Sequence, residues 1–536
     1  MLATGTASRR ATAPKGVPEK RSWDVICIGS GMGSLAAAAT MARNGRSVLV
    51  LEAHNQVGGL THTFARKGVR WGTGLHYTGW STEHLRDFPQ LWDTLTGGEA
   101  PWLRLPDETD HYLHPDGAFV KRAPRQCFRE DLHAAFPGER AAIDRYFSDL
   151  GETVGELMRF APLQSLPRMV ERLGLGWWLG RRFLAADRLP LVRYMDQIGA
   201  SPQLRRHLWF AWGNFGGIPA ETSFASHAIP TESMLDGLWT SKYGSQSVAE
   251  AFAQTIRRAG GEVRRGARVS RLVFQGGRVA GVCLGDEEIR ARTVISGIGA
   301  RETYRLLVPP ERRPSHADSI LALKPSCSMF TLYLALDRAV IQRFGLTGVN
   351  YWVEGEREGL NDVWTGLSAP PPWLVLSLAA RFPHEAAGSS PTEAGEGVIP
   401  AEIFIAISGE RFRRWQETRV MKRGEEYVDF KKYLIEQTLR RVEATWPGFG
   451  SFIRYVEGAT PLTIRSFTGH EEGAAYGIAP VPGRYNNRAL RAVTGVPGLL
   501  LAGQDVGTAG VIGAFYGGLI AASAVLSRNA MKLLSR

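Results

Sequence analysis

The stretch "DVICIGSGMGSLAAAA", from Asp24 to Ala39, predicts a buried strand, a glycine-rich turn and a helix of small residues. A helix that begins directly after such a turn directs its free backbone N–H groups toward the turn, where they bind phosphate. Gly29 permits the tight turn, and Gly31 allows the backbone to approach a pyrophosphate. The third glycine of the fingerprint G-x-G-x-x-G serves only the packing of helix on strand. Ser34 stands at that position, and because serine is nearly as small, we expect phosphate binding to be retained.

The residues after the turn complete a nucleotide-binding unit. The helix is expected to continue through "SLAAAATMARNG" to Gly45, and "SVLVLE" predicts a second strand that ends at Glu52. An acidic residue about 20 positions beyond the turn accepts hydrogen bonds from a ribose. Ser30 and Gly33 complete the expected cofactor-binding turn. An ordinary strand–helix–strand crossover without a ligand is the alternative.

The doublet Gly58-Gly59, which follows Glu52, decides between two dinucleotides. A doublet at this position resembles the FAD-binding branch of the dinucleotide fold, to which amine oxidases and phytoene desaturases belong. NAD-binding units usually lack this doublet. The resemblance implies an α/β protein with non-covalent FAD on a Rossmann-type domain of the glutathione reductase-like branch. A discontinuous α+β substrate domain is expected beside it.

The same resemblance assigns cofactor contacts farther along the chain. Residues 260–300 predict a β-meander that returns to the parallel sheet at "TVISGIG", and Val269 matches the position whose backbone touches adenine. Near the C-terminus, "GLLLAGQDVGTAGVIGAFYGGL" predicts a strand, a loop with Gly503 and a helix that begins near Gly510. By resemblance, Asp505 binds the ribityl chain, and the helix N-terminus stabilises the reduced flavin. A plain helix N-cap is the alternative role for Asp505.

Five motifs in this order look like the retinol saturase and carotenoid isomerase branch of the phytoene desaturase superfamily: "LEAHNQVGGLTHTF", "WGTGLHYTGW", "TPLT", "GAAYG" and "LLLAGQDVGTAG". The resemblance covers residues 23–527, although "SKYGSQS" at 241–247 departs from the Tyr-Pro-x-Gly-Gly-Ser segment frequent in this branch. It implies an FAD-dependent oxidoreductase that saturates or desaturates C=C bonds of a lipophilic isoprenoid or polyene. A carotenoid cis-trans isomerase with reduced flavin is the alternative. A flavin amine oxidase and a non-catalytic prenyl-lipid escort are further alternatives.

His76 and Tyr77, in "GLHYTG", are the candidate catalytic residues. Both side chains carry protons, and reduction of a C=C bond needs a proton donor besides the hydride. A structural histidine bonded to the backbone is the alternative. Because no second glycine-rich nucleotide fold is apparent, electrons for a saturase are expected from NAD(P)H at the substrate opening or from a separate carrier.

The domain boundaries follow from these motifs. We expect a disordered leader over 1–21, FAD-domain segments at 22–105, 245–310 and 490–536, and substrate-domain segments at 106–244 and 311–489. Strands of the substrate domain are expected at 327–337, 373–380 and 401–409, and an amphipathic helix at 424–446.

The net charge and one stretch of the chain predict a membrane as a partner. The net charge is +12, and residues 155–215 alternate large apolar residues with arginines, including Trp177-Trp178 and Arg181-Arg182. This pattern predicts peripheral membrane contact, with a helical cap over the substrate as the alternative. No motif for nucleic acid or metal accompanies the charge, and the four cysteines lie far apart. We expect a cytoplasmic protein, peripheral on the inner face of a membrane, and a buried helix at 511–526.

Overall fold

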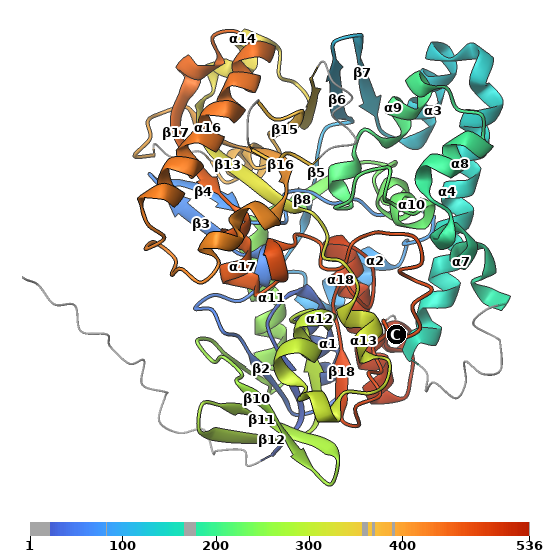
Figure 1. The fold of residues 1–536 in the computed structure, drawn as a ribbon, viewed down its shortest axis with the longest axis vertical. Helices are drawn as coiled ribbons and strands as arrows, with labels where there is room; N and C mark the ends of the chain where they lie inside the picture. Colours follow the sequence, from blue (N-terminus) through green and yellow to red (C-terminus); the bar gives the residue numbers. More distant parts are fainter. Residues whose placement is uncertain are drawn as a thin grey trace, which may run out of the picture.

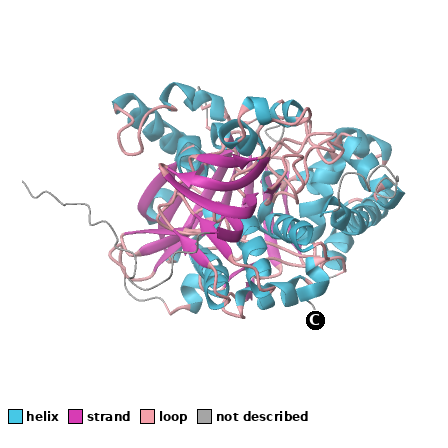
Figure 2. Cartoon of the chain, turned by 90° about the horizontal axis from the view of Figure 1, so that it is seen from below, coloured by secondary structure: helices cyan, strands magenta, loops and turns pink. Residues whose placement is uncertain are grey.

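The computed structural model describes residues 22–81, 83–165, 178–355, 363–366, 370–388 and 392–534. The expected leader and Trp177 lie outside these residues. Figure 1 shows two large β-sheets, one below the other, with a group of helices beside the upper one. Seen from below, the strands form the interior and helices surround them (Figure 2).

The lower sheet contains the predicted nucleotide-binding unit. In spatial order its strands are β10 (Arg271–Gln275), β11 (Arg278–Leu284), β12 (Glu287–Ser296), β1 (Ser22–Ile28), β2 (Val48–Leu51) and β9 (Glu262–Arg264), and β18 (Leu499–Leu501) pairs with β12. The pairs β12–β1, β1–β2, β2–β9 and β12–β18 are parallel. Strands β10, β11 and the start of β12 form an antiparallel meander. The Rossmann-type α/β fold is confirmed.

Small residues allow two helices of the lower half to pack closely. The helices here are α1 (Met32–Arg43), α2 (Phe88–Thr96), α11 (Ser245–Arg258), α12 (Ala300–Glu302), α13 (Ala317–Leu321), α18 (Gly510–Leu526) and α19 (Ala530–Leu534). A Cβ atom at Gly33 of α1 would lie 2.4 Å from the backbone of Gly503. A Cβ atom at Gly518 of α18 would lie 2.2 Å from the carbonyl oxygen of Gly33. Backbone meets backbone at both places, so only glycine fits.

The upper sheet belongs to the predicted substrate domain. In spatial order its strands are β17 (Ile453–Ala459), β13 (Ser328–Asp337), β16 (Val398–Ile407), β15 (Trp373–Ser377), β14 (Asn350–Glu354), β6 (Glu108–His114) and β7 (Gly117–Arg122). Successive side chains of a strand point to opposite faces of the sheet. One face packs against α16 (Glu425–Thr445), as the buried Leu332, Ile403 and Leu434 show. The other face carries Thr331, Tyr333 and Phe404.

Several connecting elements join the two halves. The hairpin β3 (Thr63–Arg66) and β4 (Val69–Gly72) follows the glycine doublet, yet Trp71 packs against Tyr333 and donates a 3.1 Å hydrogen bond to the carbonyl of Leu334. A second ribbon pairs β5 (Trp102–Arg104) with β8 (Trp239–Ser241). Short helices α14 (Ala339–Phe344), α15 (Arg381–Ala386) and α17 (Pro461–Thr468) border the upper sheet. Thus the predicted domain segments interlock.

A helical group covers one side of the upper half. It contains α3 (Arg125–Ala135), α4 (Arg140–Phe160), α7 (Arg181–Arg188), α8 (Leu191–Gln197), α9 (Pro202–Trp209) and α10 (Phe224–Ser233). Leu157, Phe183 and Tyr194 are buried in its core, whereas the Trp178 side chain is 63% exposed. Much of the stretch 155–215 therefore packs inside the protein, and the membrane contact expected for it stays a prediction.

The C-terminal apolar segment is an internal helix. Phe515 and Leu519 of α18 are fully buried, as the sequence predicts for residues 511–526. Across the part of the chain that the structure describes, no helix combines the length and the apolar composition that a membrane crossing requires.

Candidate active site

One large cavity, of about 1770 Å³, is lined by residues of both halves. The lower half supplies the glycine turn after β1, the doublet after β2 and the loop before α18. The upper half supplies the sheet face that carries Thr331, Tyr333 and Phe404. Every residue that the sequence nominates for the site lines this cavity: Gly29, Ser30, Gly31, Gly33, Glu52, Gly58, Gly59, His76, Tyr77, Val269, Gly503, Asp505 and Gly510. The structure brings them together, while their individual roles remain predictions.

The turn after β1 presents backbone rather than side chains to the cavity. Gly29 has φ +84° and donates a 2.8 Å hydrogen bond to the carbonyl of Leu51, which joins the turn to β2. Gly31 is the N-cap residue of α1 and offers no side-chain acceptor. The first backbone N–H groups of the helix are therefore free to bind an anion. A Cβ atom at Gly31 would meet no protein atom within 4 Å, so this backbone borders open space.

Hydrogen bonds connect Glu52 with both the glycine turn and, through Ser30, the glycine doublet. Its carboxylate accepts hydrogen bonds from the backbone N–H of Ser30 at 2.8 Å, from the Ser30 hydroxyl at 2.5 Å and from the backbone N–H of His54 at 2.7 Å. The Ser30 Oγ in turn accepts a 3.0 Å bond from the backbone N–H of Gly58. A carboxylate has about four acceptor positions. Glu52 therefore retains acceptor capacity for a ligand hydroxyl.

The departure from the glycine fingerprint at Ser34 has a structural partner. The Ser34 hydroxyl lies 3.4 Å from the carbonyl oxygen of Ile28. A Cβ atom at Gly297, just beyond β12, would lie 2.0 Å from the Ser34 Oγ. Serine fits beside the strands because the facing residue is glycine. The close backbone contact in this turn is made by Gly33, against Gly503, instead.

Val269 lies in the loop before β10, which begins at Arg271. Within the predicted β-meander, Val269 therefore belongs to a loop rather than to a strand. The backbone N–H of Ala267 donates a 2.7 Å bond to the carbonyl of Glu52, so this loop borders the carboxylate that would hold the ribose.

Asp505 connects three segments of the cavity wall. Its carboxylate accepts a 2.8 Å bond from the backbone N–H of Ala300 and a 3.2 Å bond from that of Ile478. The N-cap residue of α18 is Ala509, so Asp505 does not cap that helix. The helix carries no acidic residue in its first turn. Its N-terminus therefore presents free N–H groups and a partial positive charge to the cavity.

These features fit a dinucleotide such as FAD. Cβ atoms at Gly503 and Gly510 would meet no protein atom within 4 Å, so at both residues the backbone borders free volume. Two helix N-termini and one acidic acceptor suit a pyrophosphate, an anionic ring edge and a ribose hydroxyl. All four cysteines lie among the described residues, and none lines the cavity, so no cysteinyl attachment point is present.

His76 faces a buried carboxylate that the sequence did not single out. Its Nδ1 lies 3.5 Å from Oε1 of Glu402, whose side chain is fully buried. Among the described residues, neither oxygen of Glu402 has a hydrogen-bond partner. A buried carboxylate without a partner is costly, and the His76 imidazole is placed to pair with it. Since Nδ1 is the buried nitrogen, Nε2 is the ring atom that can reach the cavity.

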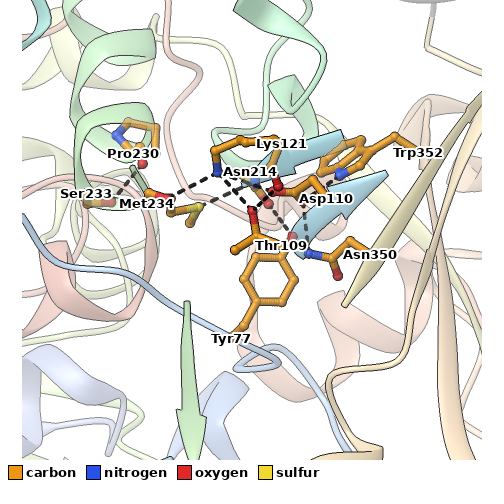
Figure 3. A network of polar contacts seen from close by, with 10 residues as sticks. All are labelled: Tyr77, Thr109, Asp110, Lys121, Asn214, Pro230, Ser233, Met234, Asn350 and Trp352. Carbon is orange, nitrogen blue, oxygen red and sulfur yellow. Dashed lines mark hydrogen bonds and ion pairs between the residues drawn. The ribbon is translucent and has the colours of Figure 1, made fainter. Parts of the chain in front are cut away.

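Tyr77 is held in a separate network, drawn in Figure 3. Its phenol donates a 2.8 Å hydrogen bond to Oδ1 of Asn214. Burial, reinforced by the negative charge of Asp110, raises the pKa of Tyr77 well above its usual value. Tyr77 therefore holds its proton more tightly than a free tyrosine does.

A buried ion pair supports the same part of the wall (Figure 3). Lys121 Nζ lies 3.2 Å from Asp110, and Lys121 also donates a 3.2 Å bond to the carbonyl of Met234. Asp110 accepts bonds from Asn350 at 3.1 Å and from Trp352 Nε1 at 2.8 Å. Met234 and Trp352 both line the cavity, so the ion pair fixes the position of two lining residues.

Sequence reasoning missed Glu402, Asn214 and Trp352. One signal was available for Glu402, because it is the only charged residue of the apolar strand β16. Asn214 and Trp352 carry no local signature, since their hydrogen-bond partners Tyr77 and Asp110 lie far away along the chain.

The fold and the site define a flavin-dependent oxidoreductase. The sequence model of the family described as flavin containing amine oxidoreductase matches residues 35–526, and the chain belongs to this family. It is an FAD-dependent oxidoreductase.

Relatives of known name agree with the predicted branch. The chain is 32% identical to all-trans-retinol 13,14-reductase of Rattus norvegicus, over 97% of this chain and 88% of the relative. It is 30% identical to the human protein of that name, with the same shares covered. Prolycopene isomerase 1 of an Oncidium hybrid cultivar is 23% identical over 87% of this chain and 76% of the relative. The resemblance to the retinol saturase and carotenoid isomerase branch is confirmed.

Solved structures agree on the fold alone. Cyclohexylamine oxidase from Brevibacterium oxydans superposes with a TM-score of 0.59 at 16% identity, over 96% of this chain and 100% of that chain. A putrescine oxidase variant gives a TM-score of 0.62 at 15% identity, over 94% and 99%.

Proposed function

We propose that the protein reduces a C=C bond of a lipophilic polyene, retinoid or carotenoid-like, with non-covalently bound FAD. When bound, FAD supplies the hydride exchange at its N5 atom. The observation that carries the proposal is one cavity that continues from the nucleotide-binding turn to the sheet face with Thr331, Tyr333 and Phe404. The names of the relatives, retinol reductases and prolycopene isomerases, support the polyene as substrate class.

The cavity volume suits two ligands. Pockets for one small molecule usually measure about 300–1,000 Å³. The observed volume of about 1770 Å³ leaves room for a long apolar molecule beside a dinucleotide. Trp352, Trp373, Val375 and Phe404 line this part. A polyene offers few polar groups, so shape and apolar contact must supply most of its binding.

His76 is the proposed proton donor, and Glu402 the residue that positions it. The carboxylate of Glu402, 3.5 Å from Nδ1, fixes the orientation of the ring, while Nε2 faces the cavity. Tyr77 is less suited to this role, because its raised pKa disfavours release of the phenolic proton and its O–H is donated to Asn214. The proposed role of Tyr77 is to shape the wall of the cavity.

Electrons must come from outside the chain if the enzyme works as a saturase. The proposed source is NAD(P)H that enters by the substrate opening, or a separate carrier protein. The proposed location is the cytoplasm, at the inner face of a membrane where a lipophilic substrate is dissolved.

The reaction can be tested without the natural reductant. The enzyme is photoreduced without air and mixed with retinol or a carotenoid. We expect the flavin to reoxidise while the polyene absorbance moves to shorter wavelength, because each saturated bond shortens the chromophore.

Other outcomes separate the alternatives. A longer chromophore with oxidised enzyme would identify a desaturase, and geometric isomers with the flavin still reduced would identify an isomerase. Hydrogen peroxide formed from amines in air would identify an amine oxidase. A protein purified without flavin, which binds prenyl lipid unchanged, would identify an escort. Acid precipitation should release the flavin into solution.

His76→Gln tests the proton donor. We expect the reduction step to slow by about 10²–10⁴-fold, the usual contribution of a positioned acid, with FAD content unchanged. Glu402→Gln should slow the step less than His76→Gln does, because it removes the carboxylate that positions the ring but leaves the donor in place. Tyr77→Phe is the control, with a smaller effect. An undiminished rate in His76→Gln removes His76 from the chemistry.

A further inference from the structure

Exposed apolar side chains gather at the opening of the cavity. Among the described residues, seven large apolar side chains are exposed, and five of them line the cavity. These five are Leu306, Val420, Met421, Val428 and Phe467. Exposed apolar residues normally occur singly, and a group of them marks a binding surface. Because these residues are both exposed and part of the cavity lining, they lie where the cavity meets solvent.

The most exposed member lies at the tip of a tight turn. The backbone N–H of Lys422 donates a 3.0 Å bond to the carbonyl of Arg419, so Val420 and Met421 occupy the two corner positions. Their side chains are 47% and 93% exposed. Turn corners usually carry Gly, Pro, Asn or Asp. Met421 also has φ +64°, which is uncommon for any residue other than glycine. Nothing inside the folded chain explains an apolar pair at this tip.

The charge around the tip is positive. Arg413 pairs with Glu410 and Glu472, and Arg414 pairs with Glu426. The bases of the segment 409–424 for which the described residues show no ion pair are Arg411, Arg419, Lys422 and Arg423. Lys422 also lines the cavity opening, next to the apolar tip. An apolar tip flanked by Lys and Arg matches a bilayer with anionic headgroups, because the tip enters the acyl region while the bases contact phosphate. An acidic protein partner would match the charge but not the exposed Val–Met pair.

We propose that the turn Arg419–Lys422, together with Val428 and Phe467, docks the protein on an anionic lipid bilayer. This surface places the cavity opening on the membrane, so that a lipophilic substrate enters from the bilayer without crossing water. The direction of substrate entry rests on the proposed function, whereas the docking itself does not. This surface, rather than residues 155–215, is then the principal membrane contact. Figure 1 shows α17, which carries Phe467, and α7, which follows Trp178, on opposite sides of the molecule.

Vesicle flotation of the FAD-loaded protein, without substrate, tests the surface. Vesicles of phosphatidylcholine are compared with vesicles in which part of it is replaced by phosphatidylglycerol. We expect binding to the anionic vesicles, weakened by salt because exposed charges are screened. The double variant Val420→Ser/Met421→Ser should lose about tenfold or more in affinity. Arg419→Gln/Lys422→Gln should reduce the dependence on phosphatidylglycerol. Trp178→Ser is the matched control, because it also removes an exposed large apolar side chain and should bind as the unchanged protein does.

FAD content and the unfolding midpoint of each variant confirm that folding is intact. The proposal is overturned if the unchanged protein binds no anionic vesicles. It is also overturned if Val420→Ser/Met421→Ser floats like the unchanged protein, or if Trp178→Ser alone abolishes flotation. A protein that binds vesicles as expected but reduces no polyene would refute the proposed function and leave the docking surface intact. The reverse result would refute only the docking surface.

Discussion

The two walls of the cavity differ in the atoms that they present to a ligand. The lower wall presents backbone: the turn at Gly29–Gly33, the doublet after Glu52 and the N-terminus of α18. The upper wall presents large side chains from the strands, such as Trp352 and Phe404. Backbone recognition requires glycine at fixed positions and leaves little freedom to vary. Side-chain recognition leaves the strands unchanged while the lining is exchanged, so one cofactor site can serve many substrates.

The largest effect is expected where the upper wall depends on a buried ion pair. Asp110→Ala leaves Lys121 buried without its charged partner, and the free energy of unfolding should fall by about 3–5 kcal/mol. Denaturant unfolding measures this loss. Asp107→Ala is the control, because it breaks the exposed pair with Arg104 and should change stability by about 0–1 kcal/mol. Equal effects of the two variants would show that the buried network does not support the wall.

Gly33 and Gly31 separate packing from ligand contact in the lower wall. Gly33→Ala forces a Cβ atom against the backbone of Gly503, so the flavin-free protein should lose about 1–3 kcal/mol of stability. Gly31→Ala places its Cβ atom in open cavity and should cost less than about 1 kcal/mol, yet weaken FAD binding. Unfolding of the flavin-free proteins and titration with FAD measure both quantities. If Gly31→Ala binds FAD normally, the pyrophosphate does not lie at this turn.

Glu52→Ala tests the single acidic contact of the lower wall. The variant removes the ribose acceptor and the bonds that hold Ser30 and His54, so FAD binding should weaken by about 1–3 kcal/mol. Quenching of flavin fluorescence reports the dissociation constant. The FAD affinity of Glu52→Gln, which keeps one acceptor oxygen, should lie between those of the unchanged protein and of Glu52→Ala. Unchanged affinity in Glu52→Ala would place the adenosine half elsewhere.

The smallest effect is expected at the position that departs from the fingerprint. Ser34→Gly restores the third glycine but adds backbone freedom inside α1, so stability should change by less than about 1 kcal/mol. FAD affinity should stay the same, because residue 34 faces Gly297 and does not line the cavity. A clear gain in FAD affinity would show that the serine does disturb the turn.

The same contrast explains how far the sequence could predict the molecule. The lower wall was predictable, because glycines, a terminal acid and their spacing report directly on backbone geometry. Strands β13, β15 and β16 were predictable from apolar and β-branched content. Their side-chain partners were not: Tyr77 and Asn214 are separated by 137 positions, and no local pattern links such residues. Val269 lines the cavity from the loop before β10, and its contact with adenine stays a prediction.

The close approach of Gly33 to Gly503 has a consequence for the synthesis of the protein. The turn that begins the cofactor site leaves the ribosome long before β18, Gly503 and the N-terminus of α18. Chains fold from the N-terminus as they are made, domain by domain. Here the FAD-binding domain starts before the substrate domain and is finished after it, because its sheet lacks β18 until residues 499–501 have been made. Flavin is therefore acquired only after β18 has been made, and nascent chains that end before residue 499 should carry none.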